Sequence, residues 1–250
     1  MNKLKDKIDG NIKFAFQPAE ELSGGAEKMI AERILENPKV DMVFALDVQG
    51  GLSKGIASIK VGSMMVSLNG FMITIKRKGG HASKPENAID PVIVVGEILM
   101  GIQTIRSRMI SIFKLLVISC TMLKGGDATN VISSEASIWG IVRTLDLEVR
   151  IQVLKLIERM VGEITKVHGE IYEFEYNKYY PILINDKKVS EILIGEAKKI
   201  LGEESYKDME IPSMGVEDFV YFWYEIRSDY ISWDSSKRER KSNTLSIIWI

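Results

Sequence analysis

The first part of the chain alternates between short apolar runs and a segment with helical spacing. Apolar runs at 12–16 and 42–46 predict two buried strands, and the apolar residues of 25–36 fall on one stripe of a helix. A strand, a helix and a second strand in this order predict a parallel sheet with a right-handed crossover. Because Glu21 and Asp47 come just after the two strands, we expect both acids at the same edge of a sheet.

The middle of the chain predicts a different arrangement. Its elements are strands at 71–76, 115–122, 134–144 and 171–176, and helices at 88–106 and 147–167. The resulting order, β-α-β-β-α-β, is typical of a ferredoxin-like α+β domain. Its size and self-sufficiency predict an inserted domain over residues 64–178.

The strand and helix alternation returns after this insertion. Residues 186–201 predict a helix of ordinary length. Residues 232–250 differ from the rest, because much of this tail is polar and charged without periodicity, and we expect no element there that completes a sheet. The sequence therefore predicts one α/β domain in two parts, 1–63 and 179–250, the second part ending in this aberrant tail.

Composition narrows the class of protein. The 250 residues are 46% apolar and 27% charged, which is ordinary for one large globular domain or two smaller ones. A net charge of −1 argues against a nucleic acid or an anionic membrane as partner, and no apolar run approaches the ~20 residues of a membrane span. The first ten residues lack the apolar centre of a signal peptide, and Cys120 is the only cysteine, so we expect a reducing, cytoplasmic location. Cys120 itself lies in an apolar run and is expected to be an inert, buried thiol.

Two adjacent carboxylates, Glu20 and Glu21, follow the first predicted strand and Pro18. Acids at the carboxyl end of a strand are well placed for a site in an open α/β sheet. One carboxylate can bind a cation while its neighbour accepts a proton. The alternative is that both acids are solvated near a helix N-terminus, where negative charge is favoured.

The two histidines of the chain differ in their surroundings. His81 follows Gly79 and Gly80, which permit a close backbone approach, and its ring could donate to an oxyanion or simply lie in a surface loop. His168 precedes Gly169 at the end of a predicted helix, so we expect it to cap that helix or to be exposed.

Two further polar residues lie near predicted strands. Asn130 belongs to a glycine-containing loop, where its amide can orient a substrate carbonyl or make a turn hydrogen bond. Arg143 lies near the end of the strand at 134–144, where a guanidinium suits a substrate carboxylate or an ordinary ion pair.

Six short motifs occur in one order along the chain. They are FQPAEE at 16–21, GGHA at 79–82, IDP at 89–91, TNVI at 129–132, VRT at 142–144 and SMGVEDF at 213–219. Together they resemble the zinc-dependent aminoacylase/carboxypeptidase family, metallopeptidase family twenty. The resemblance covers about residues 8–231 and is to the branch of N-acyl-amino-acid amidohydrolases, hippurate hydrolases, auxin-conjugate hydrolases and thermostable carboxypeptidases.

The resemblance implies a fold and a set of roles. The fold is a zinc-peptidase α/β sandwich interrupted by a ferredoxin-like lid domain that forms a homodimer. By residue, Glu20 is implied as the general base and Glu21 as a metal ligand. His81 is implied to steady the oxyanion in a partner subunit's site, and Asn130 and Arg143 to hold the substrate's carbonyl and carboxylate.

This chain also departs from the family pattern. The family carries a Cys-Gly-His-Asp motif before the paired acids, and none precedes Lys13 here. Asp47 takes the place of a ligand histidine, and no histidine occurs in the tail where the family has another. Carboxylate oxygen can bind zinc, so we expect zinc, or another divalent metal such as cobalt or manganese, to be bound weakly.

These observations predict a metal-dependent hydrolase of amide bonds in N-acyl amino acids or peptides. The incomplete ligand set predicts a fragment with little or no activity alone. The alternative is a non-catalytic, dimerising remnant or one half of a split enzyme.

Overall fold

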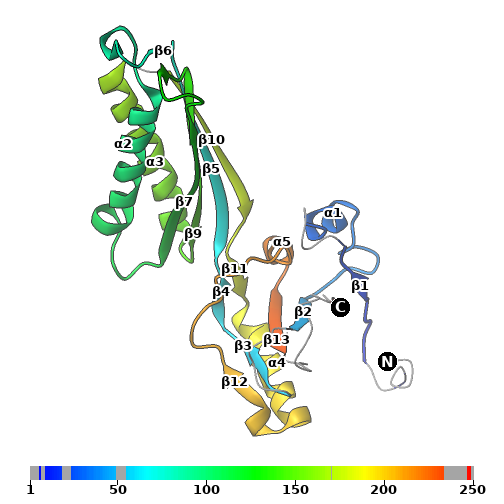
Figure 1. Cartoon of the computed structure of the whole chain (residues 1–250). Coiled ribbons are helices and arrows are strands. Elements are labelled where there is room, and N and C mark those ends of the chain that lie inside the picture. Colours follow the sequence, from blue (N-terminus) through cyan, green and yellow to red (C-terminus); the bar gives the residue numbers. More distant parts are fainter. Residues whose placement is uncertain are drawn as a thin grey trace. The chain divides into compact units, whose positions relative to one another are not determined.

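The computed structural model of this chain describes residues 6, 9–18, 24–48, 55–169, 171–233 and 247–248. The fold is mixed α/β and divides into two compact units (Figure 1). Unit 1 comprises Met1–Val66 and Leu183–Ile250, and unit 2 comprises Ser67–Ile182. The sequence had placed the inserted domain at 64–178, a few residues earlier at each end.

Unit 1 is built on a four-stranded sheet in the order β12-β3-β13-β2. At its centre β13 (Ser228–Trp233) pairs in parallel with β2 (Val43–Val48). The short strands β3 (Ala57–Ile59) and β12 (Tyr206–Asp208) extend the sheet on the other side. The remaining elements are α1 (Ala26–Ala31), β4 (Gly62–Met65), β11 (Leu183–Asn185), α4 (Lys187–Leu201), η4 (Glu203–Ser205) and α5 (Val220–Glu225).

The first predicted strand does not join β2 in the four-stranded sheet of the described residues. Strand β1 is only Ala15–Phe16, and it pairs antiparallel with β14 (Ile247–Ile248), so β2 takes its parallel partner from β13 instead. The helix after β1 is also shorter than predicted, because the left-handed φ of 64° at Arg33 cannot continue an α-helix. The tail, expected to form no element, contributes β14.

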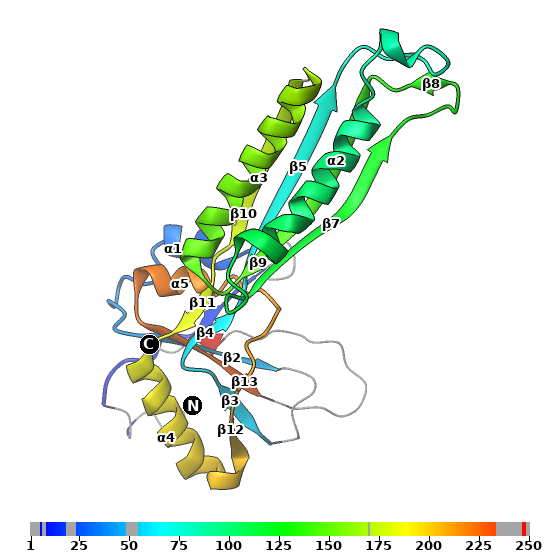
Figure 2. The same cartoon turned by 90° about the vertical axis from the view of Figure 1, so that its left-hand side faces the viewer.

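Unit 2 consists of a four-stranded antiparallel sheet in the order β10-β5-β9-β7. The strands are β5 (Ser67–Lys76), β7 (Leu116–Gly125), β9 (Glu135–Thr144) and β10 (Ile171–Tyr180). Helices α2 (Pro91–Thr104) and α3 (Leu147–His168) lie over one face of this sheet (Figure 2). Shorter pieces are β6 (Gly80–His81), β8 (Val131–Ile132), and the turns η2 (Pro85–Asn87) and η3 (Ile105–Met109).

The core of unit 2 lies between its helices and its sheet. Its buried residues recur at every second strand position and every third or fourth helix position, as such layers require. They include Phe71, Ile73, Ile75, Val95, Ile98, Ile102, Ile138, Val142, Val153, Ile157 and Val161. Strand β5 begins earlier than predicted because its polar start is buried and satisfied: Ser67 donates to the Thr144 carbonyl at 3.2 Å, and Asn69 donates to the Val142 carbonyl at 3.3 Å.

Candidate functional site

The carboxyl ends of β2 and β13 carry two buried side-chain oxygens, one from Asp47 and one from Ser232. Asp47 and Ser232 are direct neighbours in the parallel register, so their side chains point to the same face of the sheet. Oδ1 of Asp47 and Oγ of Ser232 are both buried and have no hydrogen-bond partner among the described residues. Buried polar atoms are nearly always paired, so the pair indicates a place for a further polar group.

Tyr230 lies on the same face, two residues before Ser232. Its hydroxyl donates to Oε2 of Glu217 at 3.0 Å, and the ring is fully buried. Burial raises the pKa of the Tyr230 phenol well above its usual value, and the nearby carboxylates of Glu217 and Asp47 raise it further. The phenol therefore stays protonated, and it holds Glu217 in place as a donor.

Asp218 joins the two ends of the segment that contains the paired acids. Its Oδ2 accepts from the backbone N–H groups of Gly25 at 2.5 Å and Ala26 at 3.0 Å, at the start of α1. Its Oδ1 accepts from Nε2 of Gln17. Gly25 has no room for a Cβ, which would meet the carbonyl oxygen of Pro18.

The predicted base Glu20 and the predicted ligand Glu21 lie outside the described residues. Within the described ranges, no group of three or more His, Cys, Asp or Glu side chains converges to hold a metal ion. Asp47 offers one free oxygen there, whereas a catalytic zinc needs about three protein ligands. The described residues alone therefore do not fit a catalytic zinc site.

In unit 2 the structure brings His81 and Asn130 together. Strand β6 places His81 opposite Val131, and the next backbone N–H, that of Ala82, donates to the Asn130 carbonyl at 3.0 Å. Both side chains are exposed. Nδ1 of His81 accepts from the Ser83 backbone N–H at 3.1 Å, so the neutral ring carries its proton on Nε2. His81 can therefore donate one hydrogen bond outward.

Arg143 lies apart from these two residues. It is half-buried near the end of β9, opposite Leu68 and Val117 in the neighbouring strands. Asn130 precedes the other end of β9, and the eight residues from Glu135 to Arg143 span roughly 25 Å of strand. Within unit 2, one small ligand cannot touch Arg143 together with the other two residues.

The remaining predicted groups have structural surroundings. Nε2 of His168 lies 2.9 Å from Oε2 of Glu97, and the cap of α3 is Gly169, with φ 65°. Cys120 is half-buried in β7 rather than fully buried. Burial raises the pKa of its thiol to about 11, so it is not a thiolate near neutral pH.

Sequence reasoning missed the roles of several buried residues at the sheet edge. Glu217 and Asp218 belong to the SMGVEDF motif, but their hydrogen bonds could not be read from it. Those of Asp218 reach residues up to 201 positions away, and that of Glu217 reaches Tyr230, 13 positions away. Tyr230 and Ser232 belong to no motif. Their only signal is that polar groups recur at alternate positions, Ser228, Tyr230 and Ser232, in a segment where the sequence had predicted no strand.

Comparisons with known proteins match most of the chain. The model of peptidase family M20/M25/M40 matches residues 1–237. An N-acetylcysteine deacetylase of Bacillus subtilis is 33% identical over 92% of this chain and 60% of its own length. An N-acyl-L-amino acid amidohydrolase of Geobacillus stearothermophilus is 38% identical over 74% of this chain and 50% of its own length.

A solved structure agrees with these matches. The crystal structure of a dinuclear metal-binding peptidase of the M20 family from Bacillus subtilis superposes with a TM-score of 0.72, at 28% identity, over 90% of this chain and 56% of that one. The chain thus spans about half to three fifths of the length of these relatives. No helix in the described ranges is long and apolar enough to cross a membrane.

Proposed function

Because the chain belongs to peptidase family M20/M25/M40, we propose that it takes part in metal-dependent hydrolysis of amide bonds in N-acyl amino acids or peptides. The observation that carries this proposal is the carboxylate of Asp218. It holds Gln17 and Gly25, the two ends of the segment with Glu20 and Glu21. On the neighbouring strand β13, Tyr230 binds Glu217 and lies close to Asp47 of β2. The names of the relatives support the substrate class.

Within this proposal Glu20 is the proton acceptor, and Glu21 and Asp47 are metal ligands. The named metal-binding relative supports a divalent cation, and zinc, cobalt or manganese is the proposed occupant. Oxygen is the only ligand type that these two acids offer, so the cation is held weakly and the activity of the chain alone is small. We also propose a reducing compartment such as the cytoplasm, which the single cysteine supports.

The test is hydrolysis of N-acetyl and N-benzoyl amino acids by the purified chain, with zinc, cobalt or manganese added. We expect slow release of amino acid that stops with a chelator and with Glu20→Gln. The control Glu27→Gln, on α1, should keep the rate. Release that continues after chelation, or that is equal in Glu20→Gln, would contradict the proposal.

We propose unit 2 as the ferredoxin-like lid domain and the site of a homodimer. Strand β7 is an edge of its sheet, and exposed apolar side chains gather on β7 and on the neighbouring helix α2. They are Ile93, Met100, Met122 and Leu123. Pairing of two β7 edges would cover these side chains, and it would let His81 and Asn130 serve the other copy while Arg143 serves its own.

Light scattering after size-exclusion chromatography tests the dimer. We expect a dimer for the natural chain and a monomer when both Met122 and Leu123 are changed to Lys. Ile171→Lys on β10, at the opposite edge of the sheet, should leave the dimer intact. A natural chain that stays monomeric at high concentration would refute this interface.

A second candidate is one half of a split enzyme, or a non-catalytic dimerising remnant. Three observations favour it. Asp47 has an oxygen with no partner among the described residues, β2 is an edge of the described four-stranded sheet, and 40% or more of each relative has no counterpart in the match. Co-expression with the unmatched part of a relative should restore tight metal binding if the split form is right. Unchanged metal content would favour the remnant.

A further inference from the structure

A cavity of unit 1 lies at the opposite edge of the sheet from Asp47. It has a volume of about 960 Å³, near the upper end of the range of small-molecule sites. Asp41 and Met42 enter it from just before β2, and Ile226 and Arg227 from just before β13. Since these strands are parallel, the cavity lies at their amino ends, and the six residues from Asp41 to Asp47 separate it from Asp47 by roughly 20 Å.

Three cations from three different segments line this cavity. Lys39 precedes β2, Lys188 lies in the first turn of α4, and Arg227 precedes β13. None of the three side chains makes an ion pair or hydrogen bond with another described residue. Unpaired cations around one hollow favour an anion.

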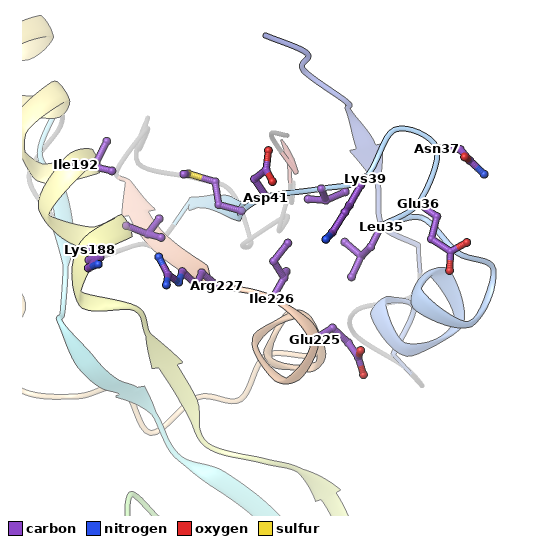
Figure 3. A pocket seen from close by; sticks show the side chains of 13 residues that line it. Leu35, Glu36, Asn37, Lys39, Asp41, Lys188, Ile192, Glu225, Ile226 and Arg227 are labelled. Atoms are coloured by element: carbon purple, nitrogen blue, oxygen red, sulfur yellow. The ribbon is translucent and has the colours of Figure 1, made fainter.

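The cavity wall also carries three acids, Glu36, Asp41 and Glu225, which equal the cations in number but differ in where their carboxylates point. Figure 3 shows the carboxylates of Glu36 and Glu225 pointing away from the centre of the cavity, and Lys188 and Arg227 at one end of it. Asp41 is the one acid that remains beside the cavity, and it has no ion pair with another described residue. Lys188 and Arg227 therefore form a cationic end of a cavity whose formal charges balance as a whole.

The rest of the lining is apolar. Val40 and Val189 are buried, and Leu35, Met42, Ile192 and Ile226 complete the wall. Met42 and Ile192 are 37% and 52% exposed, so part of this apolar wall is open to solvent. A ligand for this cavity gains from an apolar body as well as from a negative group.

We propose that this cavity binds an amphipathic organic carboxylate: a single carboxylate held by Arg227 and Lys188, with an aliphatic or aromatic body against Met42, Ile192 and Ile226. A planar guanidinium suits a carboxylate through two parallel hydrogen bonds, and the lysine ammonium adds charge without fixing direction. The inference rests on the cavity alone and does not depend on the proposed hydrolysis.

Calorimetric titration with 4-phenylbutyrate tests the proposal, with the neutral 4-phenylbutyramide as the matched probe. We expect saturable binding of the carboxylate, one per chain, at least about tenfold tighter than binding of the amide and weakened by added salt. Arg227→Gln and Lys188→Gln should each weaken the carboxylate by about tenfold. Lys187→Gln, the adjacent lysine that pairs with Glu191 and does not line the cavity, should leave it unchanged.

Two outcomes would overturn the proposal. The first is no saturable binding of phenylbutyrate, or equal binding of the acid and the amide, by a chain whose circular dichroism is that of a folded protein. The second is loss of binding in Arg143→Gln with no loss in Arg227→Gln, because the probe would then occupy the proposed substrate-carboxylate site in unit 2. Ile192→Asp keeps the test independent of the two cations, since it places a negative charge on an exposed wall position and should also abolish binding.

Discussion

The carboxyl group of Asp229 makes the stability of unit 1 depend on pH. Asp229 lies in β13 with no exposed surface, and Oγ of Ser190 on α4 donates to its Oδ2. Its Oδ1 has no partner among the described residues. Burial raises the pKa of Asp229 from 3.8 to about 7. The hydrogen bonds from Ser190 and the Tyr230 backbone partly oppose this rise, and the charge of Asp186 adds to it.

The sign of the effect follows from proton binding. Between about pH 4 and pH 7 the folded chain holds the Asp229 proton while the unfolded chain has released it, so unfolding becomes easier as pH rises. The stabilisation is complete below pH 3.8 and has been lost once pH passes about 7. At about 1.36 kcal/mol per pH unit, the whole change amounts to roughly 4 kcal/mol.

Asp229→Asn removes this ionisation while keeping a carbonyl oxygen that can accept from Ser190. At pH 8 we expect the variant to be more stable than the natural chain by up to roughly 4 kcal/mol, and at pH 4 the two should be nearly equal. Urea unfolding followed by tryptophan fluorescence at several pH values measures the difference. The exposed acid variant Asp41→Asn controls for general charge effects.

The result that would refute this reasoning is a stability difference between Asp229→Asn and the natural chain that does not change between pH 4 and pH 8. A constant difference would mean that the substitution acts through packing alone. A difference that shrinks as pH rises would mean that the folded state holds the carboxylate better than water does.

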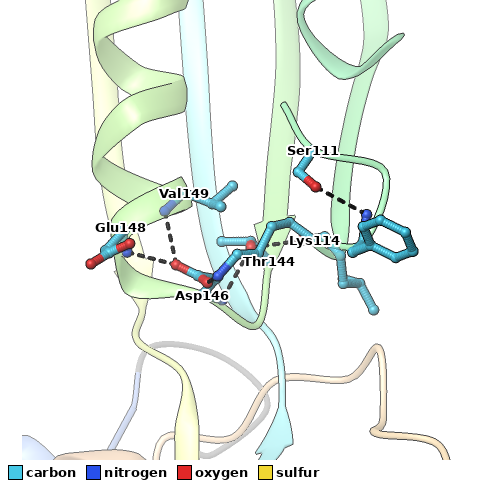
Figure 4. Close-up of polar contacts among 8 residues, drawn as sticks. Ser111, Lys114, Thr144, Asp146, Glu148 and Val149 are labelled. Atoms are coloured by element: carbon cyan, nitrogen blue, oxygen red, sulfur yellow. Dashed lines mark hydrogen bonds and ion pairs between the residues drawn. The ribbon is translucent and has the colours of Figure 1, made fainter. Parts of the chain in front are cut away.

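Three further tests address separate parts of the structure. Asp146→Ala removes the N-cap of α3 and the partner of Lys114 (Figure 4), and it should lower the free energy of unfolding by about 1 kcal/mol. Lys114→Ala breaks only the ion pair, which is partly open to solvent, and should lower that free energy by less than about 1 kcal/mol; thermal denaturation compares the two variants. Tyr230→Phe leaves Oε2 of Glu217 without its phenol donor, and it should lower the free energy of unfolding, measured in urea, by about 1–3 kcal/mol. A change near zero would show that another group replaces the phenol. Asp47→His supplies a nitrogen ligand and should raise zinc affinity by about tenfold, as measured by competition with a chelating dye; unchanged affinity would argue against Asp47 as a ligand.

The sequence was most informative where local periodicity and tertiary packing agree. The helices and strands of unit 2 lie where the apolar spacing predicted them, because a helix of 22 residues such as α3 repeats its buried face several times. Pairing in unit 1 was not predictable in this way. The choice of β13 as the partner of β2 depends on contacts between residues nearly 190 positions apart, and no local pattern encodes that choice.

The candidate site shows the same division. Asp47 could be selected from its place at the end of an apolar run, and His81 and Asn130 from their loops. The hydrogen bond of Tyr230 to Glu217 joins two segments whose chemistry is visible only after they pack. Arg143 could be selected as a charged residue near the end of a predicted strand. Its separation from His81 became known only when the structure gave the register of β9.

The carboxylate of Asp218 also sets an order of events during synthesis. Its hydrogen bonds to Gln17, Gly25 and Ala26 span between 192 and 201 positions. These bonds therefore cannot form during synthesis until almost the whole chain has left the ribosome. The sheet of unit 2 needs nothing beyond Tyr180 and can close much earlier. A nascent chain halted before residue 218 should therefore already resist protease in unit 2, while the segment that carries the paired acids is still open to cleavage.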